Sequence, residues 1–194
     1  MTHKTFPAIA SGLFLWVAAL APAFAAGPLD TAALQAQQRV AMARLSAFDG
    51  TWRGPATILA PDGQTLKLVQ TERVGPMLGD AVRVIEGRGH RSDGSVAFNA
   101  LAVISFNPQN GKYNFRSYAQ GHEGDFPIEV QEGQFVWSLQ AGPAVIRYAA
   151  SVKDGIWSEV GERLVPGQPP LKIFEMRLQR MGPTDWPAAG ALAP

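Results

Sequence analysis

GTWRGPA, residues 50–56, decides the fold, because a helical pattern ends just before it and a long series of short strands follows it. Trp52 has a large apolar ring and one N–H donor, so it can close the floor of a barrel and still reach a hydrogen-bond partner. Gly50 permits a sharp turn out of the helix. Gly54 and Ala56 share the strand face of Trp52, which predicts either close strand packing or room for a ligand above the ring.

The N-terminus has the three parts of an export signal. Lys4 supplies the positive region, Phe6 to Leu20 the apolar region, and Ala23-Phe24-Ala25 the cleavage site, so we expect residues 1–25 to be removed. An uncleaved membrane anchor is the alternative, which the prolines and glycine in this segment disfavour. We therefore predict an exported protein, periplasmic or secreted, with no membrane anchor after cleavage.

The remaining composition excludes several classes of function. Acidic and basic side chains are balanced once Lys4 is removed, so the mature chain lacks the positive charge of a nucleic-acid-binding protein. The sequence contains no cysteine, which excludes disulfides, thiol nucleophiles and thiolate metal sites.

Residues 26–48 are predicted to form a linker and a helix. No glycine or proline occurs from Thr31 to Phe48, and Asp30 can cap the helix. One side carries apolar residues at helical spacing, namely Leu34, Ala41, Leu45 and Phe48. We expect this side to plug one end of a barrel, although a fraying N-terminal tail is the alternative.

Residues 49–182 are predicted to form an all-β, antiparallel barrel of about ten strands, with a β-sandwich as the alternative. Turn signals such as Asp62-Gly63 separate the strands. The expected strands are 51–59, 65–74, 80–89, 95–106, 112–120, 126–131, 134–140, 144–153, 156–165 and 171–181. Residues 183–194 are predicted to be a disordered Pro/Ala-rich tail, with Trp186 exposed in it.

These motifs resemble those of the calycins, the lipocalin and fatty-acid-binding superfamily, and in particular a bacterial calycin-like family of unknown function, number 1579. The motifs that carry the resemblance are FDGTWRG (48–54), Leu78-Gly79-Asp80, Ile104–Asn107 with Gly111-Lys112-Tyr113, Gly155-Ile156-Trp157, and Phe174-x-Met176-x-Leu178-x-Arg180. The resemblance implies structural roles for Gly50, Trp52 and Gly54, and an arginine, Arg177 or Arg180, packed over the Trp52 ring.

The related nitrobindin-like haem proteins share the Gly-x-Trp-x-Gly opening and ligate iron through a late histidine. This sequence has no histidine after Gly124, so the resemblance does not extend to haem, and we predict no cofactor. His122 lies near Glu123 and Asp125, but we expect a solvated loop there rather than a metal site.

Glu162 and Glu175 lie on neighbouring predicted strands and are the candidate acid–base pair. Arg147, Arg163 and Arg177 are near enough in the expected sheet to neutralise them, which favours a salt-bridged wall. The sequence has no nucleophile elbow, phosphate loop or dinucleotide fingerprint.

We therefore expect a small apolar or amphipathic ligand in the barrel lumen. The candidate ligand-binding residues are Trp52, Phe115, Arg116, Tyr118, Trp137, Arg147, Tyr148, Trp157 and Phe174. Two alternatives stay open: an isomerase or hydrolase built on the barrel, and a structural or interaction protein whose barrel is filled by side chains.

Overall fold

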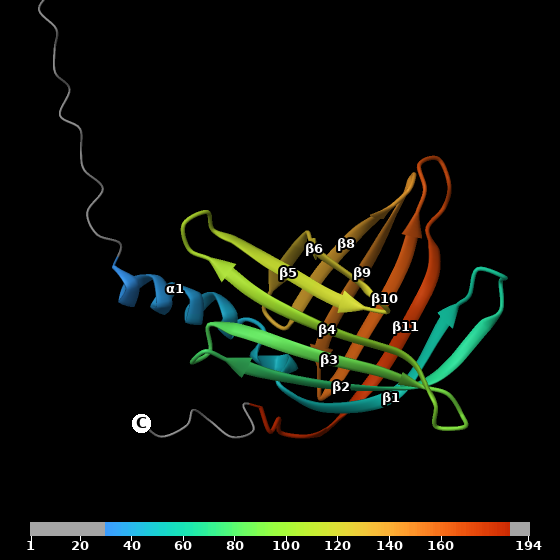
Figure 1. The fold of residues 1–194 in the computed structure, drawn as a ribbon, viewed down its shortest axis with the longest axis horizontal. Helices are drawn as coiled ribbons and strands as arrows, with labels where there is room; N and C mark the ends of the chain where they lie inside the picture. Colours follow the sequence, from blue (N-terminus) through green and yellow to red (C-terminus); the bar gives the residue numbers. More distant parts are fainter. Residues whose placement is uncertain (1–29, 187–194) are drawn as a thin grey trace, which may run out of the picture.

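The computed structural model describes residues 30–186, which form a helix, a short 3₁₀ helix and a single eleven-stranded antiparallel sheet (Figure 1). The predicted signal peptide, most of the linker and residues 187–194 lie outside the described residues. The elements are α1 (Thr31–Ala43), η1 (Ser46–Phe48), β1 (Gly50–Leu59), β2 (Thr65–Met77), β3 (Val82–His90), β4 (Val96–Asn107), β5 (Lys112–Ala119), β6 (His122–Phe126), β7 (Ile128–Gln131), β8 (Gln134–Ala141), β9 (Ala144–Lys153), β10 (Ile156–Leu164) and β11 (Leu171–Gly182).

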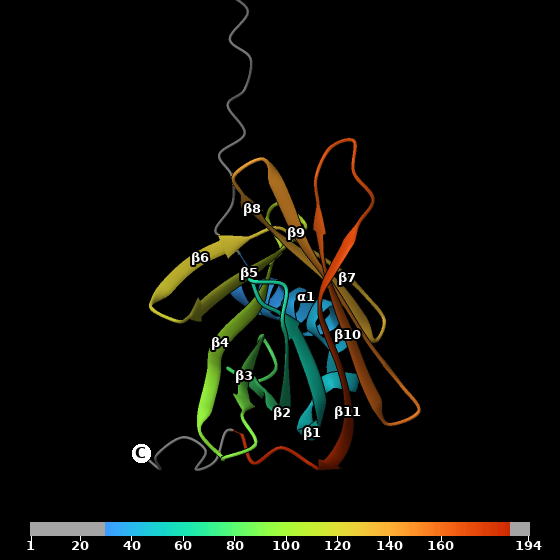
Figure 2. The ribbon, with the colours of Figure 1, turned by 90° about the vertical axis from the view of Figure 1, so that its right-hand side faces the viewer.

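The sheet curls into a nearly closed barrel. Its strand order is β6-β5-β4-β3-β2-β1-β11-β10-β9-β8-β7, so the first strand pairs with the last one. All other neighbours are consecutive hairpins, as the closely spaced turn signals predicted. Figure 2 shows the ring of strands from the end opposite α1, so that α1 lies behind the strands.

The hydrogen-bonded ring is open at one seam, where β6 and β7 end the sheet on either side. Aromatic side chains cover this seam. The ring of Phe115 on β5 stacks 4.9 Å from that of Trp137 on β8, and Phe126 lies 6.4 Å from Phe115 and 5.6 Å from Trp137. Packing, rather than a ladder of backbone hydrogen bonds, therefore completes the barrel wall.

The helix closes one end of the barrel only with its last turn. Asp30 caps it by accepting a hydrogen bond from the backbone N–H of Ala33 at 3.1 Å. Buried side chains begin near its C-terminal end, with Ala41 and Met42, and continue through Leu45 to Phe48. The N-terminal half extends away from the barrel in Figure 1, so the plug is shorter than the predicted amphipathic side.

The floor of the barrel is an aromatic cluster directly above this plug. The Trp52 ring packs edge-on against Trp157 at 5.8 Å, and Phe48 packs edge-on against Trp157 at 5.0 Å. Trp52 Nε1 donates a 2.8 Å hydrogen bond to the Phe48 carbonyl, which satisfies the indole where it is buried. Arg180 covers the other side, with its guanidinium carbon 4.2 Å from the centre of the Trp52 ring. The core thus fills the closed end of the barrel.

Gly54 brings β1 and β11 close together beside this floor. A Cβ at this position would lie 2.1 Å from the Arg177 carbonyl oxygen, so only glycine fits. Of the two roles expected for small residues above Trp52, the structure shows close strand packing. Arg177 itself is exposed, and it is Arg180 that lies over Trp52, as the resemblance implied for one of the two.

Two segments differ from the sequence prediction. The loop expected at residues 121–125 is largely strand β6, because its residues pair with β5. The first residues of the expected tail, 183–186, lie against β2: the Trp186 Cβ is 2.6 Å from where a Cβ would stand on Gly75, and the Arg73 guanidinium lies 5.3 Å from the Trp186 ring centre. Trp186 is accordingly half-buried.

Candidate functional site

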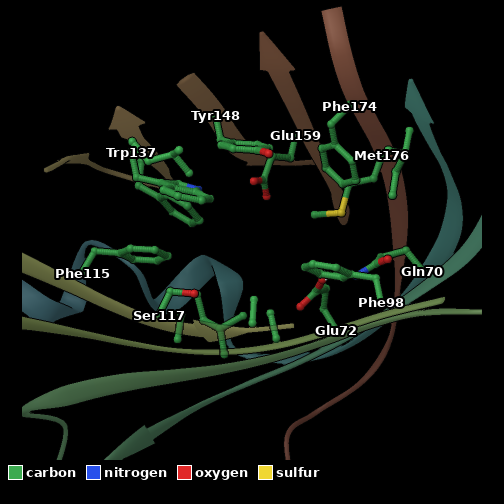
Figure 3. Close-up of a pocket in the computed structure, with 18 of the residues that line it drawn as sticks. Gln70, Glu72, Phe98, Phe115, Ser117, Trp137, Tyr148, Glu159, Phe174 and Met176 are labelled. Atoms are coloured by element: carbon green, nitrogen blue, oxygen red, sulfur yellow. The ribbon is translucent and has the colours of Figure 1, made fainter. Parts of the chain in front are cut away.

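A cavity of about 420 Å³ occupies the barrel above the aromatic floor (Figure 3). Its volume lies in the range of small-molecule sites, which runs from about 300 to 1,000 Å³. Most of the lining is apolar: Ile58, Leu59, Ile85, Gly87, Phe98, Ala100, Ala102, Phe115, Ala119, Phe135, Leu139, Ile173, Phe174 and Met176. The polar or amphipathic lining residues are Gln70, Glu72, Ser117, Trp137, Tyr148, Trp157 and Glu159.

Two carboxyl groups enter this cavity from different walls. Figure 3 shows Glu72 reaching in from β2 on one side and Glu159 from β10 on the other. Both residues are buried, with 8% and 9% of their surfaces exposed. Neither forms a salt bridge with any described residue, and no lysine, arginine or histidine lines the cavity.

Burial raises the pKa of Glu72 well above its ordinary value, because an ionised carboxylate loses its hydration there. The side-chain amide of Gln70 opposes this increase by donating a 2.7 Å hydrogen bond to Glu72 Oε1. The charges of Glu159 and Glu86 raise the pKa of Glu72 further.

Burial likewise raises the pKa of Glu159 to about 7. The indole N–H groups of Trp137 and Trp157 partly offset this increase in the pKa. Trp157 Nε1 is nevertheless buried without a hydrogen bond of normal geometry to the described chain. A polar donor close to Glu159 is therefore available at the edge of the cavity.

Glycines on neighbouring strands make room for these side chains. Gly87 pairs with Glu72 across β2 and β3, and a Cβ on Gly87 would stand 2.6 and 2.8 Å from the two carboxyl oxygens of Glu72. Gly161 pairs with Tyr148 in the same way, and its Cβ would meet the Tyr148 ring at 2.6 Å. The backbone pairing therefore sets the position of the Glu72 carboxyl and of the Tyr148 ring.

An aromatic wall runs beside Glu159. Trp137 stacks on Tyr148 with ring centres 4.4 Å apart and an interplanar angle of 9°, and Phe115 stacks on the other side of Trp137. Phe174 meets Tyr148 at 5.9 Å in an edge-on arrangement. Burial, and secondarily the charge of Glu159, raises the pKa of Tyr148 to about 12, so its hydroxyl is a neutral hydrogen-bond group.

The structure places five of the candidate ligand-binding residues on the cavity wall. They are Phe115, Trp137, Tyr148, Trp157 and Phe174. Trp52 lies one layer lower, in the floor, and does not line the cavity.

Arg116, Tyr118 and Arg147 differ from their predicted position, because they lie on the outer face of the barrel. Each is next in sequence to a residue that faces the lumen, and side chains alternate across a strand. Arg116 bonds Asp125 at 2.6 Å and Glu123 at 3.2 Å, which occupies both acids of the 121–125 segment. No group of three potential metal ligands occurs within residues 30–186.

The candidate acid–base pair also lies outside the lumen. Glu162 bonds Arg147 at 3.1 Å, and Glu175 is paired with Lys172. Glu162 and Glu175 therefore belong to a salt-bridged wall, in which a lysine, Lys172, takes the place of one expected arginine. Glu72 and Glu159 are the lumen carboxyls that sequence reasoning missed. Glu159 shares strand parity with Trp157, which was the available signal.

Comparison with known proteins supports the fold. The solved structure described as "Crystal Structure of Rv2717c from M. tuberculosis" is similar, with a TM-score of 0.54 and 12% sequence identity over 71% of this chain and 94% of that chain. At this identity the similarity bears on the fold alone. No family model and no curated protein matched the sequence. Over the part of the chain that is described, no helix has the length and apolarity needed to cross a membrane.

Proposed function

We propose that this protein is an exported, calycin-like barrel that binds a small apolar or amphipathic molecule in its lumen. The observation that carries the proposal is the cavity of about 420 Å³ with a predominantly apolar and aromatic wall. Such a wall releases water from apolar ligand surface, which contributes about 25 cal/mol per Å² buried. The few polar groups would fix the orientation of the ligand.

A lumen-filling variant tests this proposal. Ala100 lines the cavity, whereas Leu101, its neighbour on β4, is partly exposed with 37% of its surface accessible. We expect Ala100→Phe to abolish the fluorescence increase of a neutral hydrophobic dye, N-phenyl-1-naphthylamine, and Leu101→Phe to leave it unchanged. Native mass spectrometry of protein purified gently from its source would identify a bound molecule. A wild-type protein that carries no ligand and binds no dye would refute the proposal.

A second candidate function is acid–base catalysis in the same lumen. It is favoured by the pKa of Glu159, about 7, because a general acid or base works best near the ambient pH. The outer positions of Glu162 and Glu175 count against the pair that the sequence suggested. Glu72 and Glu159, however, are two buried carboxyl groups that line the cavity. A reaction whose rate falls at least about 100-fold in Glu159→Gln with unchanged ligand affinity would support this candidate.

The third possibility, a barrel filled by its own side chains, is disfavoured by the open cavity. The cavity volume of about 420 Å³ lies within the range of small-molecule sites.

A further inference from the structure

The lumen has an imbalance of charge that points to the chemistry of its ligand. Glu72 and Glu159 both face it, and no basic side chain lines it. An apolar ligand alone would leave both carboxyl groups without a polar partner, apart from the amide of Gln70 and the indoles near Glu159. Buried acids without such partners are costly, so a binding site that retains two of them is matched to a ligand that satisfies them.

The aromatic wall adds a second, independent feature. Stacked Trp137 and Tyr148 stand beside Glu159, with Phe174 next to Tyr148. Phe115 and Tyr148 cover the two faces of Trp137, so this wall presents apolar ring surface for the body of a ligand beside the Glu159 carboxyl. Trp157 Nε1, buried without a normal hydrogen bond in the described chain, is a donor near Glu159 and therefore favours the ionised carboxylate that a cation would pair with.

We propose that the ligand is an amphipathic organic cation, whose ammonium group lies between the Glu72 and Glu159 carboxyls while its apolar body packs along the Trp137, Tyr148 and Phe174 wall. This inference rests on the proposed binding function and specifies the head group of the ligand. An ammonium group has donors for both carboxyl groups, and charge-assisted hydrogen bonds are about twice as strong as neutral ones. Gly87 leaves space for the Glu72 carboxyl at this point.

Three probes with the same eight-carbon chain test the head group: octylamine, 1-octanol and octanoate. We expect octylamine to displace N-phenyl-1-naphthylamine at a concentration at least about tenfold lower than 1-octanol, a factor that one net charge-assisted hydrogen bond supplies. Octanoate should bind most weakly of the three, because no basic side chain lines the lumen to pair with its carboxylate. Equal binding of octylamine and 1-octanol would overturn the inference while the proposed binding function stands. Failure of all three probes and the dye would refute both.

Carboxyl-neutralising variants provide the matched test. Glu159→Gln and Glu72→Gln should each reduce octylamine affinity at least about tenfold and leave 1-octanol affinity within about twofold. Glu162→Gln, on the outer face and paired with Arg147, is the control and should change neither. If the preference for octylamine over 1-octanol survives in both lumen variants, the inference is wrong. The 1-octanol measurement shows that each variant is still folded.

Proton release gives a further readout. The titratable groups facing the ligand are Glu72, Glu159 and Tyr148, and Glu86 raises the pKa of Glu72 from the outer face. A cation favours the ionised carboxylates, so calorimetry in two buffers of different ionisation enthalpy should show release of about one proton per octylamine at pH 6. 1-Octanol should release none. Octylamine binding without proton release would contradict the proposed position of the ammonium group.

Discussion

The carboxyl groups of Glu72 and Glu159 face one apolar lumen from two walls of the barrel, and the charge of Glu159 raises the pKa of Glu72. Structural acids are normally paired with bases, as Glu162 is paired with Arg147 on the outer face of the same strand, β10. Two acids of β10 therefore differ in effect: Glu162 stabilises the outer wall, whereas Glu159 in the lumen costs stability when it is ionised.

The pH dependence of stability should report this cost. The folded-state pKa of Glu159, about 7, exceeds the ordinary glutamate value of 4.5, so the folded protein binds more protons than the unfolded chain between these pH values. Its stabilising contribution is therefore complete below pH 4.5 and lost as the pH rises through 7. From pH 5 to 8 we expect wild-type protein to lose about 2–3 kcal/mol of unfolding free energy relative to Glu159→Gln.

Urea unfolding of both proteins at the two pH values measures this difference. Glu162→Gln is the control, because its carboxyl is on the outer face, and it should follow the wild-type pH dependence. Parallel pH profiles for wild type and Glu159→Gln would show that Glu159 is not held neutral by burial.

The Arg180 guanidinium should stabilise the closed end of the barrel. It covers the Trp52 ring and donates to the carbonyls of Ala47 and Asp49, which tie β11 to the chain around η1. Lysine keeps the charge but loses the planar fork and the stacking. We expect Arg180→Lys to lower the free energy of unfolding by about 1–3 kcal/mol.

Tryptophan fluorescence during urea unfolding would measure this loss. Arg177→Lys on the same strand is the control: its exposed side chain does not cover the Trp52 ring, as that of Arg180 does, so its effect should stay within about 0.5 kcal/mol. If both variants unfold at the same urea concentration as wild type, Arg180 has no special role in the floor.

Gly87 should be required for full stability only because the Glu72 side chain lies opposite it. The Cβ of Gly87→Ala would stand 2.6 Å from a Glu72 carboxyl oxygen, so the Glu72 carboxyl, which accepts a hydrogen bond from Gln70, must shift. We expect Gly87→Ala to cost about 1–3 kcal/mol in wild type. In a Glu72→Ala background the same change should cost less, since the carboxyl is gone. A double-mutant cycle on unfolding free energies measures the coupling, and additive effects would contradict the predicted contact.

The order of strands was accessible from local signals. Glycine- and asparagine-containing turns separate segments of strand-forming residues, and hairpin connections between neighbours follow from such short loops. The sequence did not predict a strand at 121–125, because His122, Glu123 and Asp125 are poor strand formers. Only pairing with β5, including the Arg116 ion pairs, makes this segment a strand. Residues 183–186 were predicted as part of a disordered tail for a related reason: their position depends on contacts with Arg73 and Gly75 of β2.

The sequence by itself determined an all-β chain that begins at the Gly-x-Trp turn, the strands that form it and the aromatic residues available to its lumen. Tertiary structure alone decided which of them face inward. A one-residue change of register exchanges the two faces of a strand, so Phe115 and Arg116 were equal candidates until pairing with β4 and packing against Trp137 settled their sides. The same closure brought Glu72 and Glu159, far apart in sequence, into one cavity. Their shared burial, and the raised pKa values that follow from it, exist only in the closed barrel.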